Sequence, residues 1–510
     1  MVKCERVGED IYLTQLETTE MNPISQFAQV DAARTAVIIG RQEISYGRFE
    51  ADIEGLVTWL THQGLSAGQR VGIFLRQSYW AWVCHLAALR MGLTQAALTQ
   101  EFREEAAATG LFDVALCESE GILGSDVARR VVVVSSQSMG PFAEQAAERR
   151  HADLQAEASA RRLTFTSGTT GKPKVVSLNP EMLHSRASFL QRYEGLTADT
   201  RLFELMGIDT QGGFSHSLAT WHAGGCVLLG VPVPGSLKIR HLPHGQSNVL
   251  MSAPRRLQNL LGMDPKPWDG RAARKIFVGG GRLPIQVRDE ALARACHQIS
   301  VFYSATETGL TAIGDASLLD RHPGAVGFVV DCASIEIVDQ EGRPRPPGQE
   351  GIVRSRTPHM VLGYGENLES KPDDAFRDGW FYPGDQGVML EDGLLVITGR
   401  ISETLNIGAL KFSLLDFEAE LAKFPEIKDG CAVVLKLDVG DHLALAVVCD
   451  KGVDLQALSQ QITPRLPVQV KFTLVRVPYI PRNAMGKIPR HALAKKLTEI
   501  YQRNIASSNK

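Results

Sequence analysis

The chain has 510 residues, which is too long for one compact hydrophobic core, so we expect two or more domains. Apolar residues make up 44% and charged residues 22%, a balance that is typical of globular proteins and argues against a disordered chain. The net charge of −3 produces no overall field that would attract nucleic acid or an anionic membrane, so we expect no nucleic-acid partner.

The eight cysteines are scattered along the chain and form no Cys-x-x-Cys pair. This pattern argues against a zinc site and a disulfide framework, and it fits a reducing cytosol. The first residues, MVKCERVGEDIYL, contain no apolar signal-like run, and no run of about 18 apolar residues occurs in the chain. We therefore expect a cytoplasmic protein without a membrane span.

The first part of the chain alternates between strand and helix patterns. The β-branched run at 35–39 predicts a strand, and apolar residues at helical spacing from Phe49 to Leu60 predict a helix that ends at Gly64. Similar patterns predict a strand at 71–75, a helix at 80–91 and a strand at 131–134. Strands separated by helices imply an α/β fold with largely parallel sheets.

Residues 164–174 read TFTSGTTGKPK and lie between two predicted strands, at 163–165 and 175–178. Glycines let backbone N–H groups approach an anion, and hydroxyls and lysines add donors and positive charge, which favours a phosphate site. The loop is not the P-loop, whose pattern does not occur in the chain. A flexible surface linker is the alternative interpretation. The candidate phosphate ligands are Thr166, Ser167, Gly168, Thr169, Thr170, Gly171 and Lys174.

Two further segments follow predicted strands. The glycines after the strand pattern at 276–278 indicate by themselves only a flexible turn; they are Gly279, Gly280 and Gly281. Residues 303–307, YSATE, follow the strand pattern at 299–302. Their hydroxyls and carboxylate can hold a magnesium nucleotide, because Mg²⁺ prefers hard oxygen ligands, although a solvated turn would have the same composition.

Three candidate segments lie nearer the C-terminus. Residues 380–385, WFYPGD, end in Asp385, and a lone Asp after Pro-Gly is usually a turn residue. Residues 399–403, GRISE, mark a change to shorter alternating elements, so we predict domains at 1–400 and 401–510. Residues 481–488, PRNAMGKI, contain Lys487, which alone would be interpreted as a solvated charge.

Taken together and in this order, the six segments resemble the acyl-adenylate-forming superfamily, which includes acyl-CoA synthetases, aryl-CoA ligases and nonribosomal-peptide adenylation domains. The resemblance implies a large N-terminal α/β domain of several subdomains, a small mobile C-terminal α+β domain, and an active site between them. It also implies a reaction in which a carboxylate and Mg²⁺-ATP give an acyl-AMP and pyrophosphate, after which a thiol takes the acyl group.

The resemblance also implies individual roles. Thr306 contacts phosphate, and Glu307 binds Mg²⁺. Asp385 accepts hydrogen bonds from the two ribose hydroxyls, and Arg400 reaches the nucleotide. Lys487 lies between the substrate carboxylate and the α-phosphate, where its ammonium stabilises the charge that develops in the transition state. The other residues implied for the ATP site are Gly279, Gly280, Gly281, Tyr303 and Ser304.

The chain departs from the family pattern at several positions. Ser304 stands where Gly is usual, and Ser402 stands at the expected hinge, where Asp or Lys is usual. Residues 408–411 read GALK where the family commonly has Ser-Gly-x-Arg. Ala409 narrows the expected approach of the pantetheine arm, for which Gly408 can compensate. The thioester half-reaction is therefore less firmly predicted than adenylation.

The acyl substrate is predicted less closely. The resemblance places the pocket wall at 205–214 and implies substrate contacts from Asp209, Gly213, Gly280 and Ser304. A carboxylate in a largely apolar pocket requires a cation, so Asp209 suggests an amino acid, although a solvated turn residue is equally compatible with the sequence. We favour a small or medium-sized simple carboxylic acid.

The acceptor is also open at this stage. Residues 455–510 contain ten lysines and arginines against one acid, Glu499. This excess fits either the phosphates of CoA or an acidic acyl carrier protein, and a solvated surface explains it equally well. Transfer to an amine is a second enzymatic hypothesis. A non-catalytic nucleotide-binding relative is a third, and the presence of Lys487, Glu307 and Asp385 together argues against it.

Overall fold

The computed structural model describes residues 4–7, 10–13, 22–75, 78–99, 110–119, 127–134, 158–166, 174–232, 239–241, 243–263, 266–269, 274–365, 373–407, 410–437, 440–482, 488–490 and 492–499. Within these ranges no helix is long and apolar enough to cross a membrane. Of the cysteines in these ranges, six form no disulfide bond, whereas Cys332 forms one, contrary to the expectation from the scattered spacing.

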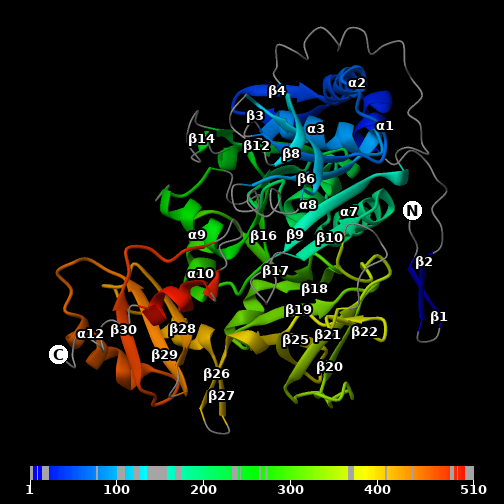
Figure 1. Ribbon diagram of the computed structural model, residues 1–510. Coiled ribbons are helices and arrows are strands. Elements are labelled where there is room, and N and C mark those ends of the chain that lie inside the picture. Colours follow the sequence, from blue (N-terminus) through cyan, green and yellow to red (C-terminus); the bar gives the residue numbers. More distant parts are fainter. Residues whose placement is uncertain are drawn as a thin grey trace.

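A six-stranded sheet in the order β10-β9-β6-β5-β7-β8 forms one layer of the large part of the molecule (Figure 1). Its strands pair in parallel except for β10 and β9, which are antiparallel on either side of the 164–174 segment. The bounds are β5 (Arg70–Phe74), β6 (Thr94–Ala97), β7 (Phe112–Cys117), β8 (Ala128–Val133), β9 (Arg161–Thr166) and β10 (Lys174–Leu178). The predicted pair of strands around this segment is therefore present.

A second sheet runs through the rest of the large part in the order β22-β23-β21-β24-β25-β19-β18-β17-β16-β15-β11-β12-β3-β4, with β20 beside β21. Its parallel half comprises β3 (Thr35–Ile39), β11 (Arg201–Glu204), β12 (Cys226–Leu229), β15 (Val249–Ser252), β16 (Lys275–Val278) and β17 (Gln298–Ala305). The antiparallel half comprises β18 (Gly309–Asp315), β19 (Ala325–Val329), β20 (Ser334–Val338), β21 (Gly351–Arg356), β22 (Phe376–Arg377), β23 (Trp380–Phe381), β24 (Asp385–Met389) and β25 (Leu394–Arg400), while β4 (Gln42–Ser45) pairs antiparallel with β3.

The prediction of largely parallel sheets is thus right for the first half of the chain and incomplete for the second. Only the three-residue turn 306–308 joins β17 to β18, and a parallel pair needs a crossover of a dozen or more residues. Two short antiparallel pairs complete the strands before residue 400: β1 (Cys4–Val7) with β2 (Asp10–Leu13), and β13 (Val231–Pro232) with β14 (Ile239–His241).

Helices cover the sheets where their apolar residues recur at helical spacing. The second helix begins three residues before the predicted apolar pattern, because the Ser45 side chain accepts a 3.2 Å hydrogen bond from the Arg48 amide and caps it. It ends where Gly64 adopts a left-handed φ of 77°. The helices are α1 (Pro23–Val30), α2 (Tyr46–His62), α3 (Ser78–Arg90), α7 (Pro180–Glu194), α8 (Gln211–His222), α9 (Pro254–Met263) and α10 (Ile285–Arg294).

The part after residue 400 has its own core. Leu414, Phe417 and Leu421 of one helix pack against Leu443 and Leu445 of the three-stranded sheet. This part lies beside α9 and α10 in Figure 1, in orange and red. Its elements are β26 (Thr404–Ile407), β27 (Leu410–Ser413), α11 (Leu414–Leu421), β28 (Asp429–Leu437), β29 (Gly440–Val448), α12 (Leu455–Ile462) and β30 (Phe472–Arg476). The boundary at residue 400 stays a prediction, which these separate cores support.

Candidate active site

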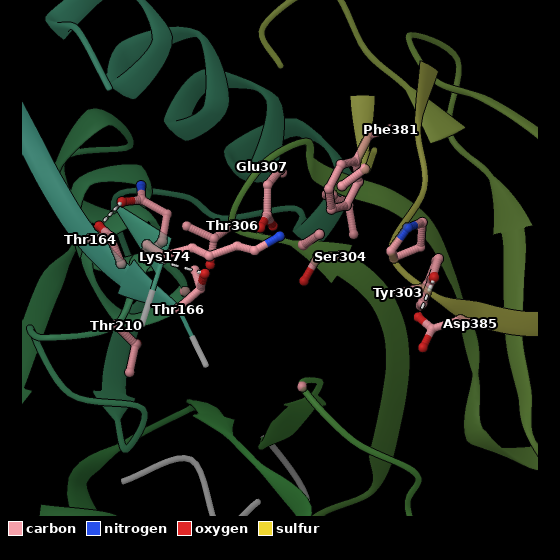
Figure 2. Close-up of a pocket in the computed structure, with 18 of the residues that line it drawn as sticks. Thr164, Thr166, Lys174, Thr210, Tyr303, Ser304, Thr306, Glu307, Phe381 and Asp385 are labelled. Atoms are coloured by element: carbon pink, nitrogen blue, oxygen red, sulfur yellow. Dashed lines mark hydrogen bonds between the residues drawn. The ribbon is translucent and has the colours of Figure 1, made fainter. Parts of the chain in front are cut away.

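A cavity of about 750 Å³ opens at the edge where the two sheets of the large part meet. Its walls come from β9 and β10, from the end of β17 and the turn after it, and from β24 and the end of β25. Figure 2 shows Thr164 and Thr210 at one end of this cavity and Tyr303 and Asp385 at the other. The Lys174 side chain extends between them toward Ser304.

Ten predicted site residues line this cavity: Thr166, Lys174, Asp209, Gly280, Tyr303, Ser304, Thr306, Glu307, Asp385 and Arg400. The other predicted residues of the phosphate segment and the predicted catalytic lysine lie outside the described residues; they are Ser167, Gly168, Thr169, Thr170, Gly171 and Lys487. The residues that the structure does describe therefore come from segments more than 200 positions apart in the chain.

Three predicted glycines do not line the cavity, and two of them, Gly279 and Gly213, allow close packing instead. A Cβ on Gly279 would overlap the Phe302 ring, and a Cβ on Gly213 would overlap the Gly207 carbonyl. Gly281 faces Pro254, whose Cγ and Cδ would lie 3.8 Å from its Cβ. The neighbouring Gly212, which the sequence did not single out, lines the cavity in place of Gly213.

The Asp385 carboxylate is held from two sides at one end of the cavity. Asp385 is only 5% exposed; its Oδ2 accepts a 2.6 Å hydrogen bond from the Tyr303 hydroxyl, and its Oδ1 accepts a 2.9 Å bond from Arg400 Nε. Burial raises the pKa of Tyr303 well above its usual value, and Asp385 adds to this effect. Tyr303 therefore stays a neutral donor, and each carboxylate oxygen retains a lone pair that can accept a further hydrogen bond.

A β-bulge aims Tyr303 and Ser304 at the cavity. The pairing of β17 with β18 shifts register between these two residues, which removes the strict alternation of faces. Consequently Tyr303, Ser304 and the following Ala305 all line the cavity.

The Glu307 carboxylate lies in the middle of the cavity wall and is 7% exposed. Its Oε1 accepts a 2.8 Å hydrogen bond from the Tyr364 hydroxyl. The Lys174 ammonium lies 4.3 Å from the centre of the Tyr364 ring and pairs with Asp373 at 2.9 Å. A carboxylate beside a lysine provides oxygen for a divalent cation and positive charge for phosphate.

Arg186 of α7 lines the cavity and holds the turn after β17, and the sequence did not reveal it. Its Nη1 donates to the Thr306 carbonyl at 2.7 Å, and its Nη2 donates to the carbonyls of Glu307 at 2.9 Å and His359 at 3.0 Å. Burial lowers the pKa of Arg186 to about 10, against the opposing effect of Glu307. Nothing in a surface-like helix sequence identifies an arginine that binds the backbone of a turn 120 residues away.

The opposite end of the cavity combines apolar walls with polar groups from α8. The apolar side chains are Phe189, Leu190, Met206 and Phe302, and the polar ones include Gln211, Ser215 and His216. His216 Nδ1 donates to the Gly212 carbonyl at 2.6 Å, and its Nε2 lies 2.7 Å from Glu194 Oε1. Burial opposes protonation of His216, but pairing with Glu194 outweighs it and raises the pKa.

Two further carboxylates belong to this end: Asp209 lines the cavity, and Glu204 does not. Burial raises the pKa of Glu204 to about 7, although its carboxylate accepts the amides of Met206 and Gly207. Burial also raises the pKa of Asp209, against the opposing charges of Arg256 and Arg162. Asp209 therefore already has cationic neighbours within the protein.

The predicted hinge residue, Ser402, lies in the short 3-10 helix Ile401–Glu403 between β25 and β26 and is exposed. The preceding Ile401 lines the cavity, and its amide donates to the Gly384 carbonyl at 2.9 Å. The connection between the two parts of the chain thus begins at the cavity wall, one residue after Arg400. Rotation about Ser402 stays a prediction.

The chain resembles known ligases along its length. It is 27% identical over 342 residues to the medium-chain fatty-acid–CoA ligase of Escherichia coli strain K12. This match covers 65% of this chain and 60% of the ligase, which is less than two thirds of the ligase's length. It is 26% identical to the 3-hydroxybenzoate–CoA ligase of an Aromatoleum species, over 92% of this chain and 95% of the other.

Solved structures have the same fold. ATP-bound MatB from Rhodopseudomonas palustris matches with a TM-score of 0.77 and 24% identity, over 95% of this chain and all of the other. The o-succinylbenzoate CoA synthetase MenE from Bacillus subtilis, in complex with ATP and magnesium, matches with a TM-score of 0.78 and 20% identity, over 92% of this chain and 98% of the other. The predicted α/β fold is confirmed.

The family model described as AMP-binding enzyme matches residues 24–365, two thirds of the chain. This match confirms the resemblance that the motifs indicated. The chain belongs to the AMP-binding enzyme family of acyl-adenylate-forming proteins.

Proposed function

We propose that the protein is an ATP- and Mg²⁺-dependent carboxylic acid ligase that forms an acyl-AMP and pyrophosphate and then transfers the acyl group to the thiol of CoA. The observation that carries the proposal is the order of groups along one cavity. Asp385 lies at one end, where it would bind a ribose, and Glu307 and Lys174 lie in the middle. The other end, between α7 and α8, would accommodate the acid.

The residues in the middle of the cavity fit a magnesium nucleotide. The Glu307 carboxylate would hold the ion, because carboxylate oxygen is a preferred Mg²⁺ ligand and this carboxylate is oriented by Tyr364. Bound Mg²⁺ neutralises phosphate charge. The hydroxyls of Thr306 and Thr166 and the ammonium of Lys174 line the same wall and would bind the phosphate oxygens.

In the first half-reaction, a carboxylate oxygen of the acid attacks the α-phosphorus of ATP. An oxygen–phosphorus bond forms as the bond to pyrophosphate breaks, and negative charge grows on the α-phosphate oxygens. The resemblance assigns Lys487 the role of stabilising this charge. Arg186 holds the 306–307 turn in place by donating to the carbonyls of Thr306 and Glu307. In the second half-reaction, the thiol sulfur attacks the acyl carbon, AMP leaves, and the thiol proton is released.

CoA is the acceptor that the relatives favour, because those compared above are named as CoA ligases. Transfer to an acyl carrier protein or to an amine remains the alternative outcome of the test. For the acid, Arg256 and Arg162 already give the Asp209 carboxylate cationic neighbours within the protein, although burial still raises its pKa, so Asp209 does not by itself require the ammonium of an amino acid. A simple carboxylic acid therefore stays the preferred substrate.

The test is carboxylate-dependent ATP–pyrophosphate exchange over a panel of aliphatic acids, aryl acids and amino acids, with and without Mg²⁺. Exchange that requires one acid class and Mg²⁺ supports the proposal, and added CoA must then convert the adenylate to a thioester. Exchange without thioester formation would move the acceptor to a carrier protein or an amine. Exchange with amino acids alone, lost in Asp209→Asn, would overturn the preference for a simple acid, and no exchange with any acid would contradict the enzyme assignment.

A further inference from the structure

Two helices provide walls at the acid end of the cavity, the end between α7 and α8. Phe189 and Leu190 of α7 line the cavity there, and so do Ser215 and His216 of α8. The two helices also pack against each other. The width of the acid end therefore depends on how α7 and α8 are held together.

A buried ion pair joins the two helices. Glu194, the last residue of α7, accepts on Oε1 a 2.7 Å hydrogen bond from His216 Nε2, and His216 Nδ1 donates to the Gly212 carbonyl within α8 at 2.6 Å. The Glu194 and His216 side chains are 1% and 3% exposed. Glu194 Oε2 has no hydrogen-bond partner in the part of the chain that the structure describes, so the bond to His216 is what fixes this carboxylate there.

The ion pair offsets an unfavourable position for a carboxylate. Glu194 ends α7, where it meets the negative end of the helix dipole, and burial further disfavours its charge. Burial lowers the pKa of His216, but pairing with Glu194 outweighs this effect and raises it. The protonated imidazole donates from both nitrogens, once within α8 and once to α7.

His216 belongs to the cavity wall, whereas Glu194 lies behind it. The His216 ring lines the cavity, and its centre lies 5.7 Å from the centre of the Phe302 ring, which lines the same end. Glu194 is not among the described residues that line the cavity. A change at Glu194 therefore reaches a bound acid through His216 and through the spacing of the two helices.

The polar groups of this wall are already bonded within the protein. Gln211 Nε2 donates to Ser215 Oγ at 2.8 Å, and Gln211 Oε1 accepts from the Thr164 hydroxyl at 3.4 Å. Both nitrogens of His216 are engaged as well. The apolar members of the wall are Phe189, Leu190, Met206 and Phe302. A wall of this kind distinguishes acids by size and shape more than by hydrogen bonding.

We propose that Glu194 is a positioning residue for acid selectivity: through His216 it holds α8 to α7 and so limits the width of the acid that the cavity accepts. The proposal rests on the proposed function and narrows its substrate class to a carboxylic acid with an apolar body of limited width. Glu194 touches none of the reacting groups, and it acts through the wall that His216 forms.

The experiment compares two variants of nearly equal size. Glu194→Met fills the same space without a strong acceptor for His216, whereas Glu194→Gln keeps an amide that bonds to a neutral imidazole. For each protein, kcat/KM in pyrophosphate exchange is measured for the best acid and for its homologue with one more methyl branch. One extra carbon in an apolar pocket is worth about 10–200-fold, so we expect a wild-type ratio of at least about tenfold.

Glu194→Met should lower this ratio by about fivefold or more, and Glu194→Gln should stay within about twofold of the wild type. A ratio that is unchanged in Glu194→Met, or that falls equally in Glu194→Gln, would overturn the positioning role. Glu194→Leu, which is also apolar and of similar size, takes the place of Glu194→Met if that variant does not fold.

His222→Ala is the matched control. His222 Nε2 lies 2.8 Å from His184 Nδ1, so this variant also removes a side-chain link between α7 and α8, and neither histidine is among the described residues that line the cavity. Denaturant unfolding reports the stability of both variants. His222→Ala should keep the wild-type ratio even where it loses as much stability as Glu194→Met. An equal fall in the ratio would show a general loosening and would overturn the specific role of Glu194.

A second measurement does not depend on catalysis. Crystal structures of the wild type and of Glu194→Met give the separation of the His216 and Phe302 ring centres, which is 5.7 Å here, and the position of α8 relative to α7. We expect the His216 ring to move away from Phe302 and the two helices to separate in the variant, and superimposable helices and rings would overturn the proposal. A wild-type protein without exchange for any acid, together with the expected separation in the variant, would instead contradict the proposed function alone.

Discussion

Asp385 and Arg400 stand directly opposite each other on the antiparallel strands β24 and β25, and Arg400 Nε donates to Asp385 Oδ1 at 2.9 Å. Cross-strand partners of opposite charge stabilise each other, and here the pairing also fixes the carboxylate that would receive a ribose. Asp385 raises the pKa of Arg400, so the guanidinium remains charged at every working pH. The proposed nucleotide end of the cavity is therefore organised without a ligand.

The first prediction concerns the other side of this carboxylate. Tyr303→Phe removes the 2.6 Å bond to Asp385 Oδ2 but keeps the ring. A hydrogen bond to a charged group contributes about 1.5–3 kcal/mol, so we expect the KM for ATP in pyrophosphate exchange to rise by about tenfold or more. Tyr193→Phe, in which the lost hydroxyl lies outside the cavity, is the control. A KM for ATP that does not change would show that the hydroxyl does not orient Asp385.

The second prediction concerns the arginine that holds the 306–307 turn. Arg186→Met leaves three buried carbonyl groups without their donor, and each unsatisfied group costs about 1–3 kcal/mol. We expect a loss of about 2–4 kcal/mol in the free energy of unfolding and a raised Mg²⁺ requirement in pyrophosphate exchange, because Glu307 loses its fixed backbone.

Denaturant unfolding and a magnesium titration of Arg186→Met check both effects. Arg192→Met is the matched control, because Arg192 lies on the same helix with 48% of its side chain exposed. Equal behaviour of the two variants would contradict the role of Arg186, and Arg186→Lys should be intermediate because an ammonium satisfies fewer of the carbonyls at once.

The third prediction concerns pH. Burial raises the pKa of Glu204 from its unfolded value of 4.5 to about 7, so the folded state binds more protons than the unfolded state between these values. The contribution of Glu204 to the free energy of unfolding must then fall as the pH rises from about 4.5 to 7. Glu204→Gln removes this proton uptake, so its stability should fall less over the same range.

Melting temperatures at pH 5 and pH 7.5 check the Glu204 prediction. We expect the difference between these two pH values to shrink by the equivalent of about 1–3 kcal/mol in Glu204→Gln. The exposed Glu391→Gln is the control. A wild-type curve that rises over this range in parallel with the variant would contradict the raised pKa.

The fourth prediction concerns the lysine assigned through the resemblance. Lys487→Ala removes the positive charge proposed to stabilise the α-phosphate in the transition state, and such losses cost about 10²–10³ in rate. Pyrophosphate release should fall by that factor, while thioester formation from supplied acyl-AMP should not change. Lys495→Ala, at an exposed position of the same C-terminal region, controls for the loss of charge. Wild-type turnover in Lys487→Ala would contradict the mechanism.

The sequence predicts the nucleotide half of the site better than the acid half, for a physical reason. Thr306 and Glu307 directly follow β17 and Asp385 begins β24, and strand ends can be recognised from short apolar runs. Arg186 and His216 act through contacts with partners far along the chain or one helix away, and no local pattern records such contacts. Gly213 and Gly279 illustrate the same limit of local patterns, because they were predicted to line the site. In the structure they instead allow close packing against Glu204 and Phe302.

One helix has a consequence for how acids are distinguished. Arg186 holds the Thr306–Glu307 turn, and Phe189 and Leu190, one turn further along α7, form the wall at the acid end. An acid that is too large for that wall must push on the same helix that positions the Glu307 carboxylate, the proposed Mg²⁺ ligand. Misfit at the acyl end is thereby transmitted to the phosphate, so selectivity among acids should appear in kcat and not in KM alone.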